Sequence, residues 1–365
     1  MTRARSDRSI SNARTRVARF CTDHGMSAPI LMAPMAGACP PALAAAVIEG
    51  GGMGGCGALL MDAEAIVRWA ADVRARHDGP FQINLWMPDL PPERDAERER
   101  AVADFLTAWG PRPDHLSAEP PVSFADQCDA LIKARPAAAS SIMGLFPPQM
   151  VERLKAEHIP WFATVTSVVE AAEAEAAGAD VIVAQGGEAG GHRGAFDADK
   201  AAAQTIGLVA LVPAICDTVR LPVVATGGIA DARGMVAALA LGASAVQIGT
   251  GLLRTPEASI APAWAEGIGL ARPEDTTVTR AFSGRPGRAL RTDYVAATEQ
   301  PGTPLPLPYP LQRSATASMR ANGAQQDDLA RLQAWAGQSA SLARAAPAAE
   351  IVRTIWADVN NASVI

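Results

Sequence analysis

Short apolar runs alternate along the chain with longer, alanine-rich stretches of helical periodicity. Several of the short runs have no polar face, which is typical of parallel strands that helices cover on both sides. The pattern predicts strands at residues 29–34, 53–58, 81–86, 141–145, 161–165, 181–184, 222–225 and 245–248. It predicts helices at residues 41–49, 63–76, 148–157, 167–177, 205–219 and 231–241. A helix therefore follows most of the strands.

This alternation of strand and helix predicts an α/β fold, a closed (β/α)8 TIM barrel. An open, doubly wound sheet is the alternative. The barrel is favoured because the strand count reaches eight and because glycine clusters recur at the carboxyl ends of the predicted strands. In such a barrel the loops after the strands carry the function.

Two intervals are longer than one helix requires. Residues 87–140 contain proline clusters and a charged helical stretch that begins near Glu93. Residues beyond the eighth strand contain a proline-rich stretch at 301–310 and a predicted helical tail from about Gln325. We predict a flexible N-terminal tail over 1–13, the barrel over 14–255, and a C-terminal helical extension over 256–365 that packs on the barrel as a lid or subdomain.

The composition restricts the class of protein. Apolar residues make up 49% of the chain, enough for a large core, and the net charge is −6 with 5% aromatic residues. These values argue against nucleic acid or an anionic membrane as a partner. The partner we expect is a small-molecule substrate, and the expected assembly is a monomer or homodimer. The five cysteines form no C-x-x-C pair, which favours a reducing cytoplasm over a disulfide scaffold or zinc ribbon.

The termini and hydropathy add little to this assignment. The chain has no apolar run of about 18 residues and no hydrophobic signal segment. The arginine-rich and serine-rich N-terminus is compatible with a transit peptide, but a solvated tail is the preferred interpretation.

Two glycine loops follow the seventh and eighth predicted strands, at residues 226–229 and 247–251. Loops at these positions of a barrel build phosphate sites from backbone N–H groups. The densest glycine cluster lies at residues 184–194, after the sixth strand, and presents His192. Such a loop lets the backbone pass close to a ligand, so we interpret His192 as functional although a lone histidine is often structural.

Other side chains near this loop leave alternatives open. Glu188 is a competing acid or base, or it anchors the loop to backbone amides. No second His or Cys accompanies His192 at metal-ligand spacing, so no metal site is expected. Asn84 at the end of the third strand suits the edge of a heterocyclic ring, although it could equally satisfy a turn.

A phosphate site beside an imidazole favours a phosphorylated cofactor, and FMN fits best because it joins one phosphate to a flat ring. Pyridoxal phosphate would require a strand-end lysine, and Lys133, Lys155 and Lys200 lie elsewhere. No P-loop motif occurs, and the glycine run at 50–55 precedes a strand instead of opening a helix.

Taken together, these motifs resemble the nitronate monooxygenase family, formerly called 2-nitropropane dioxygenase. The likeness runs through residues 29–37, 184–194, 225–229 and 247–250, and continues at 281–286, 309–312 and 335–338. It covers about residues 14–356 in the correct order, which is hard to reach by chance.

The resemblance implies an FMN-containing barrel that oxidises alkyl nitronates with O₂ to carbonyl compounds and nitrite, without a metal. The resemblance also allows neutral nitroalkanes as substrates. His192 matches the family's active-site histidine, which supplies a hydrogen bond to the nitronate or removes the α-proton of a nitroalkane. The cofactor-binding residues predicted from the loops and the resemblance are Ala33, Pro34, Met35, Asn84, Gln185, Gly190, Gly227, Gly228, Gln247, Ile248, Gly249 and Thr250.

Two segments depart from the family pattern. The family often has an aromatic residue or His before the turn that here reads Ile142-Met143-Gly144-Leu145, and residues 112–128 also look different. Both segments would border the substrate, so they leave its identity open.

Three rival functions are compared, and two of them are kept. One is a flavin-dependent enoyl-acyl-carrier-protein reductase, which has the same barrel and a similar Gly-Gly-His loop but uses NADH or NADPH. An inosine-monophosphate-dehydrogenase-like barrel is disfavoured because its catalytic Cys would be Cys56, after the second strand. A non-catalytic flavin-binding or sensor protein is the third.

Overall fold

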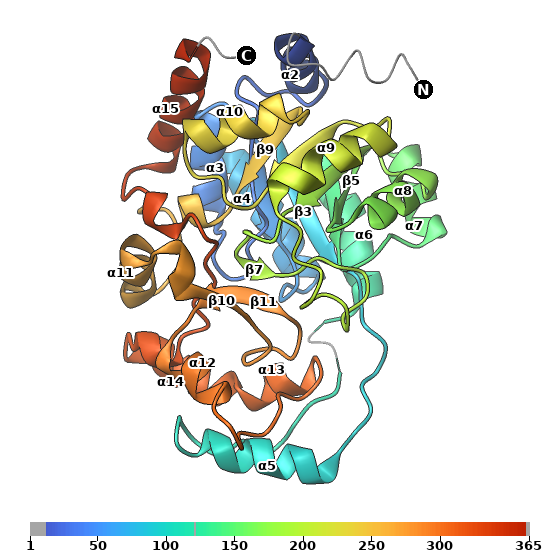
Figure 1. The fold of residues 1–365 in the computed structure, drawn as a ribbon. Coiled ribbons are helices and arrows are strands. Elements are labelled where there is room, and N and C mark those ends of the chain that lie inside the picture. The colour runs from blue at the N-terminus through green and yellow to red at the C-terminus, as the bar shows by residue number, and fades with distance from the viewer. Residues whose placement is uncertain (1–11, 120–121, 363–365) are drawn as a thin grey trace.

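In a computed structural model the described residues are 12–119 and 122–362. Eight parallel strands form one sheet in the order β1-β9-β8-β6-β5-β4-β3-β2, surrounded by helices (Figure 1). The sheet nearly closes because Met32 donates its N–H to the Met53 carbonyl at 2.8 Å, and Met53 donates to Ile30 at 3.0 Å. The predicted (β/α)8 barrel is confirmed.

The barrel elements follow the chain in order. Its strands are β1 (Ile30–Met32), β2 (Gly54–Gly57), β3 (Phe81–Trp86), β4 (Ala138–Ile142), β5 (Trp161–Val165), β6 (Val181–Gln185), β8 (Val223–Thr226) and β9 (Ala245–Ile248). Its helices are α3 (Pro41–Glu49), α4 (Ala63–Arg76), α6 (Phe124–Ala134), α7 (Pro148–Ala156), α8 (Val168–Ala176), α9 (Leu208–Thr218) and α10 (Ala232–Ala240). Side-chain caps begin several of them, as where Asp231 accepts the N–H of Gly234 at the start of α10.

The predicted fourth strand is wrong in position. The apolar pattern favours residues 141–145, whereas β4 is Ala138–Ile142. Alanine and serine form this strand because they lie beside a bulky neighbour: Ala139 pairs with Trp161 of β5, whose indole N–H donates to Ser141 Oγ at 3.0 Å. Met143 then takes a positive φ of 70° and ends the strand. Packing against Trp161 therefore overrides the weak strand propensity of alanine.

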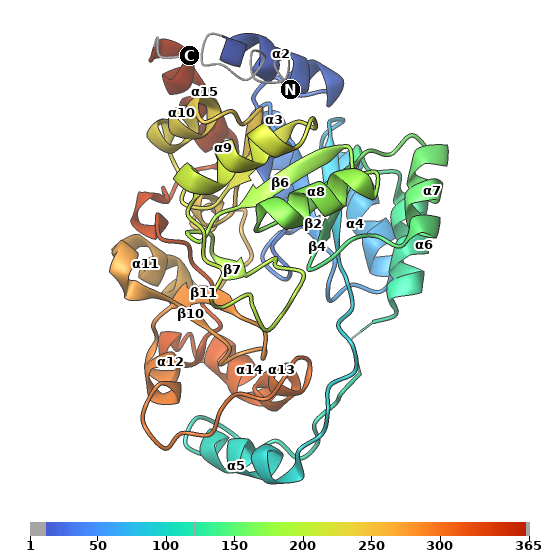
Figure 2. The same cartoon turned by 45° about the vertical axis from the view of Figure 1, so that its right-hand side comes forward.

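A group of elements beside the barrel, here called the outer subdomain, combines two distant parts of the chain. It contains α5 (Ala96–Leu106), β10 (Thr276–Thr279), β11 (Gly287–Leu290), α12 (Asp293–Thr298), α13 (Leu311–Ala315) and α14 (Ala317–Gln325). Both views place α5 beside α13 and away from the barrel (Figures 1 and 2). Val102 and Leu106 of α5 share a hydrophobic core with Phe282 and Tyr294. The insertion after β3 thus packs with the region beyond β9.

The predicted helical tail from about Gln325 is helical only in part. Helix α14 ends at Gln325, and short 3₁₀ turns η4 (Leu329–Arg331) and η5 (Ala340–Leu342) follow before α15 (Ala348–Asn361). Helix α15 packs on α3 and α10 of the barrel. The helix breaks because Asp327 adopts a positive φ of 50°, and the chain then runs back to the barrel.

The remaining elements lie at the two ends of the barrel. Helix α2 (Ala13–Asp23) packs near the amino ends of the strands, where His24 contacts Phe162. Helix α11 (Pro262–Leu270) and the turns η2 (Thr250–Leu252) and η3 (Pro273–Asp275) lead from β9 to β10. The predicted tail and its transit-peptide alternative fall largely on residues 1–11, outside the described residues. The domain boundary at 255 stays a prediction. Within the described chain, no helix combines the length and apolar character that a membrane span needs.

Candidate active site

A cavity of about 470 Å³ lies at the carboxyl ends of the barrel strands, between the barrel and the outer subdomain. The sequence-predicted residues that line it are Ala33, Pro34, Met35, Asn84, Gln185, Gly190, His192, Gly227, Gly228, Gln247, Gly249 and Thr250. Ile248 is the exception, because its side chain is buried in the barrel core. Loops far apart in sequence therefore meet at one cavity, while their contacts with a cofactor stay predictions.

The two glycine loops form a cradle of backbone donors. Gly227 and Gly228 have positive φ values of 116° and 65°, and a Cβ atom on Gly228 would lie 3.1 Å from Glu188 Cβ. The N–H groups of Gly228, Ile229 and Gly249 find no hydrogen-bond acceptor within residues 12–119 and 122–362. Unpaired N–H groups that face a cavity are suited to bind an anion such as a phosphate.

Amide side chains form the polar part of the cavity floor. Gln82 donates from Nε2 to Gln247 Oε1 at 3.0 Å and to the Met32 carbonyl at 3.0 Å. Asn84 donates to Ser140 Oγ at 3.1 Å. These bonds leave Gln247 Nε2 as a donor and Asn84 Oδ1 as an acceptor, a pair suited to the edge of a flat heterocycle.

The side-chain amide of Gln185 has a structural role. Its Nε2 donates to the His192 carbonyl at 3.0 Å, and its Oε1 accepts the Gly194 N–H at 2.8 Å. The side chain thus fixes the loop that carries His192. A contact between Gln185 and the cofactor stays a prediction.

Glu188 was predicted to be either an acid or base or an anchor of the glycine loop, and the structure favours the anchor. Its carboxylate accepts the Leu208 N–H, at 2.9 Å to Oε1 and 3.2 Å to Oε2, at the first residue of α9. Glu188 is not among the residues that line the cavity. It anchors the glycine loop to a helix N-terminus, where a negative charge is favourable.

His192 lies on a short strand that the sequence did not predict. Strand β7 (Gly191–His192) pairs antiparallel with β11, with His192 opposite Gly287. The imidazole lies 4.8 Å from the ring of Trp86 and 4.8 Å from that of Trp335, measured between centroids. Its Nε2 atom is 2.7 Å from Ser283 Oγ. Strand pairing and ring contacts therefore hold the imidazole at the cavity wall.

The electrostatic environment keeps this imidazole neutral. Burial lowers the pKa of His192 to about 3, and the positive charges of Arg285, Arg313 and Arg320 lower the pKa in the same direction. At neutral pH the ring is therefore uncharged and carries one hydrogen on one nitrogen.

The sequence did not single out Arg313 and Arg320, two cavity residues of the outer subdomain. The family resemblance reached only the nearby segments 309–312 and 335–338. Arg320 donates to Gln333 Oε1 at 3.2 Å and to the Arg313 carbonyl at 2.9 Å. The Arg313 guanidinium makes no hydrogen bond or ion pair with any other described residue, and no Asp or Glu is among the residues lining the cavity. The cavity is consequently positive where it meets the outer subdomain.

No group of three His, Cys, Asp or Glu side chains that could hold a metal ion occurs in the described part of the chain. Together, these features define a (β/α)8-barrel protein with a cavity at the strand ends, whose backbone donors and positive charges suit a small anionic ligand.

Comparison with known proteins identifies the family. The family model described as nitronate monooxygenase matches residues 19–358. A nitronate monooxygenase of Pseudomonas aeruginosa is 41% identical over 351 residues, which cover 92% of this chain and 97% of that protein. One from Paraburkholderia phytofirmans is 38% identical over 339 residues, covering 90% and 91%. The chain belongs to the nitronate monooxygenase family, which confirms the resemblance.

Solved structures place the fold among related barrels. The structure of nitroalkane oxidase from Streptomyces ansochromogenes aligns with a TM-score of 0.84 and 31% identity, over 94% of this chain and 98% of that one. FabK from Thermotoga maritima aligns with a TM-score of 0.73 and 28% identity, over 94% and 96%.

Proposed function

We propose that this protein is an FMN-dependent enzyme that oxidises alkyl nitronates with O₂ to carbonyl compounds and nitrite. The observation that carries the proposal is the division of one cavity into two chemically different parts. Free backbone N–H groups lie on the barrel side of the cavity. The other side holds the neutral His192 and the unpaired positive charge of Arg313. Such a cavity suits a phosphorylated cofactor beside a second, anionic molecule.

The residues present fit FMN. The N–H groups of Gly228, Ile229 and Gly249 would hold the phosphate, and side chains on those glycines would fill the cradle. Asn84 and Gln247 would meet the polar edge of the flavin ring. When bound, the flavin supplies the redox chemistry, and the protein supplies orientation and electrostatics.

The outer part of the cavity suits the substrate. A nitronate is an anion, and the guanidinium of Arg313 can donate hydrogen bonds to its oxygens without first breaking an internal ion pair. Because His192 is neutral, a ring nitrogen with a free lone pair can accept the α-proton of a neutral nitroalkane. Trp86 and Trp335 contact the imidazole, each with its ring centroid 4.8 Å away.

A direct experiment tests this function. Purified protein should be yellow, and denaturation should release FMN and not FAD. Anaerobic addition of a simple alkyl nitronate should bleach the flavin absorbance, and in air nitrite and the carbonyl compound should accumulate. A colourless protein that binds no added FMN would contradict the proposal.

One rival function has a specific observation behind it. The likeness to FabK covers nearly the whole chain, although its TM-score and identity are lower than those of the nitroalkane oxidase. This rival, the enoyl-acyl-carrier-protein reductase, predicts rapid anaerobic bleaching of the flavin by NADH or NADPH. We expect neither nucleotide to reduce the flavin at a useful rate, and stopped-flow absorbance separates the two functions.

A further inference from the structure

The hydroxyl group of Ser283 is the meeting point of three hydrogen-bonding groups. Its Oγ atom is 2.7 Å from His192 Nε2, 3.2 Å from the Arg285 carbonyl and 3.3 Å from the Arg285 N–H. Ser283 is only 1% exposed and Arg285 is 2% exposed, so water does not replace these bonds. The available hydrogens must therefore satisfy the groups among themselves.

Counting hydrogens distinguishes the two tautomers of His192. The Arg285 carbonyl has no other donor within the described residues, so it needs the Ser283 hydroxyl hydrogen. If that hydrogen goes to the carbonyl, His192 must carry its own hydrogen on Nε2 and donate it to Ser283. In the other tautomer, His192 Nε2 has no hydrogen and accepts the hydroxyl hydrogen of Ser283. The buried Arg285 carbonyl is then left without a donor, which is unfavourable.

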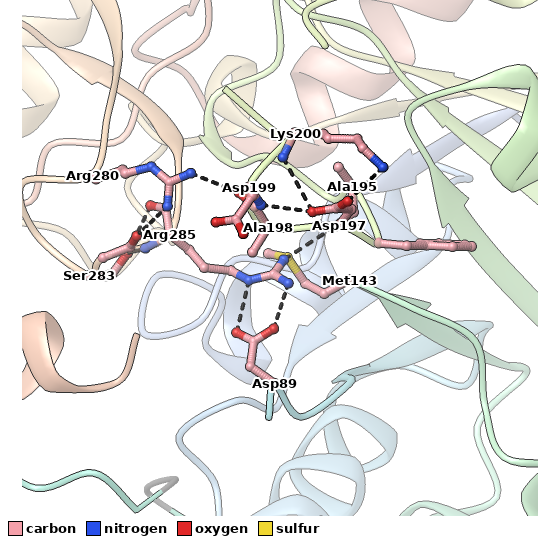
Figure 3. A network of polar contacts seen from close by, with 12 residues as sticks. Asp89, Met143, Ala195, Asp197, Ala198, Asp199, Lys200, Arg280, Ser283 and Arg285 are labelled. Atoms are coloured by element: carbon pink, nitrogen blue, oxygen red, sulfur yellow. Dashed lines mark hydrogen bonds and ion pairs between the residues drawn. The ribbon is translucent and has the colours of Figure 1, made fainter. Parts of the chain in front are cut away.

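Arg285 holds this arrangement in place from the other end. Its guanidinium forms a two-pronged ion pair with Asp89, at 2.9 Å from Nε and 2.6 Å from Nη2. Nη1 donates to the Ala195 carbonyl at 3.3 Å and contacts the sulfur of Met143 (Figure 3). One side chain thereby joins the segments after β3, β4 and β7 to the turn that carries Ser283.

The neighbouring charges do not compete for Arg285. Arg280 donates to the carbonyls of Gly284 at 3.1 Å and Ala198 at 2.8 Å, which fixes the same turn from the opposite side. Asp197 pairs with Lys200 at 2.9 Å (Figure 3). Among the ion pairs of the described residues, Asp89 is the partner of Arg285.

We propose that Ser283 is a positioning residue that fixes His192 as its Nε2–H tautomer, and that the Asp89–Arg285 ion pair holds Ser283 in place. The nitrogen left to the cavity is then Nδ1, with a lone pair and no hydrogen. His192 accordingly accepts a proton or a hydrogen bond from the ligand and does not donate one. The catalytic part of this inference rests on the proposed function, whereas the tautomer does not.

The first test reads the tautomer directly. In protein labelled with ¹⁵N-histidine, the two ring nitrogens have well-separated shifts that identify which one is protonated. We expect the Nε2–H form in the wild type, with and without added FMN, and a mixture of tautomers in Ser283→Ala. Ser318→Ala, an exposed serine on α14, is the matched control and should leave the His192 signals unchanged. An Nδ1–H wild type, or a pure Nε2–H form in Ser283→Ala, would overturn the proposal.

The second test addresses the ion pair. Asp89→Asn should shift the His192 ring signals toward those of Ser283→Ala. Asp197→Asn removes a carboxylate from the same neighbourhood without touching Arg285, and it should have no such effect. Arg285→Lys keeps one charge but loses the two-pronged geometry, so it should fall between the wild type and Asp89→Asn. If Asp89→Asn keeps wild-type ring signals, the ion pair has no positioning role.

The third test uses the two forms of the substrate. Because only the neutral nitroalkane gives up a proton to Nδ1, Ser283→Ala should lower kcat/KM for the nitroalkane by about tenfold or more and leave the nitronate within about twofold. Equal losses on both forms would reject the assigned role of Nδ1. If the wild type acts on neither form, the proposed function fails, and the ring signals still decide the tautomer.

Discussion

The two walls of the cavity are built in different ways. On the barrel side, the wall is mostly backbone: Gly228, Ile229 and Gly249 present N–H groups from turns at strand ends. On the side of the outer subdomain, the wall is side chains, with Trp335 and the guanidinium groups of Arg313 and Arg320. A backbone wall offers fixed donors to any phosphate, whereas a side-chain wall can change with the substrate.

This difference indicates where specificity lies. The barrel wall rests on strands whose register is fixed by the sheet, so its geometry varies little with side-chain identity. The outer wall rests on packing between α5 and the region beyond β9. We therefore expect substitutions in the barrel wall to affect cofactor retention, and those in the outer wall to affect substrate use.

The largest effect is expected at Gly228. A Gly228→Val side chain would meet Glu188 and force a β-branched residue to a φ of 65°, and it would fill the space of the cradle. Affinity for FMN should fall by about 100-fold, or roughly 3 kcal/mol, with loss of activity at ordinary FMN concentrations. Flavin fluorescence titration measures it. Gly302→Val has a similar φ of 85° in open space and serves as the control, so equal losses in both variants would mean that only folding is affected.

The next effect concerns His192. His192→Asn should keep bound flavin, because the glycine cradle lies in other loops. If His192 removes the α-proton, oxidation of a neutral nitroalkane should fall by about 10²-fold or more. Activity on the preformed nitronate should fall less, because its α-proton is already gone and no proton transfer to His192 is needed. Steady-state kinetics on both forms decide this, with the exposed His158→Asn as control. Small and equal losses would show that His192 is structural.

A smaller effect is expected at Arg313. Arg313→Gln removes a cation that no internal carboxylate neutralises, so KM for a nitronate should rise about tenfold, the equivalent of one charge-assisted hydrogen bond. Arg313→Lys should recover part of the loss, and FMN affinity should not change. The exposed Arg153→Gln on α7 controls for net charge. A loss of FMN affinity in Arg313→Gln would move this residue to the cofactor half of the cavity.

The smallest effect is on stability. Because the pKa of His192 is about 3 in the folded protein and near 6.5 otherwise, the unfolded chain binds a proton between these pH values and the folded chain does not. The free energy of unfolding therefore falls as the pH drops from about 6.5 toward 3. His192→Asn removes this contribution. Its free energy of unfolding, relative to that of the wild type, should therefore rise by about 1 kcal/mol as the pH falls from 7.5 to 5. This value is reduced because the imidazole borders the cavity, where solvent screens its charge. Urea unfolding of flavin-free protein measures it, and identical pH slopes would contradict the lowered pKa.

Much of the barrel could be predicted from the sequence because its elements are locally encoded. The bounds of α3 and α4 agree with the predicted helices, since capping and apolar periodicity are properties of neighbouring residues. The fourth strand could not be predicted correctly, because alanine and serine form a strand there only beside Trp161. The strand β7 was missed for the same reason, since it exists only through its pairing with β11.

The same distinction between local and tertiary effects applies to the candidate site. The sequence by itself determined the glycine loops, the eight-stranded barrel that brings them together and the prominence of His192, because these depend on local conformation and on the order of strands. Only the tertiary structure decided that Glu188 caps α9, that Ser283 bonds His192 and that Asp89 reaches Arg285. Ser283 and Asp89 act across contacts between segments that are 91 and 196 residues apart in the chain. No local pattern encodes such a contact, because it exists only once the outer subdomain has packed against the barrel.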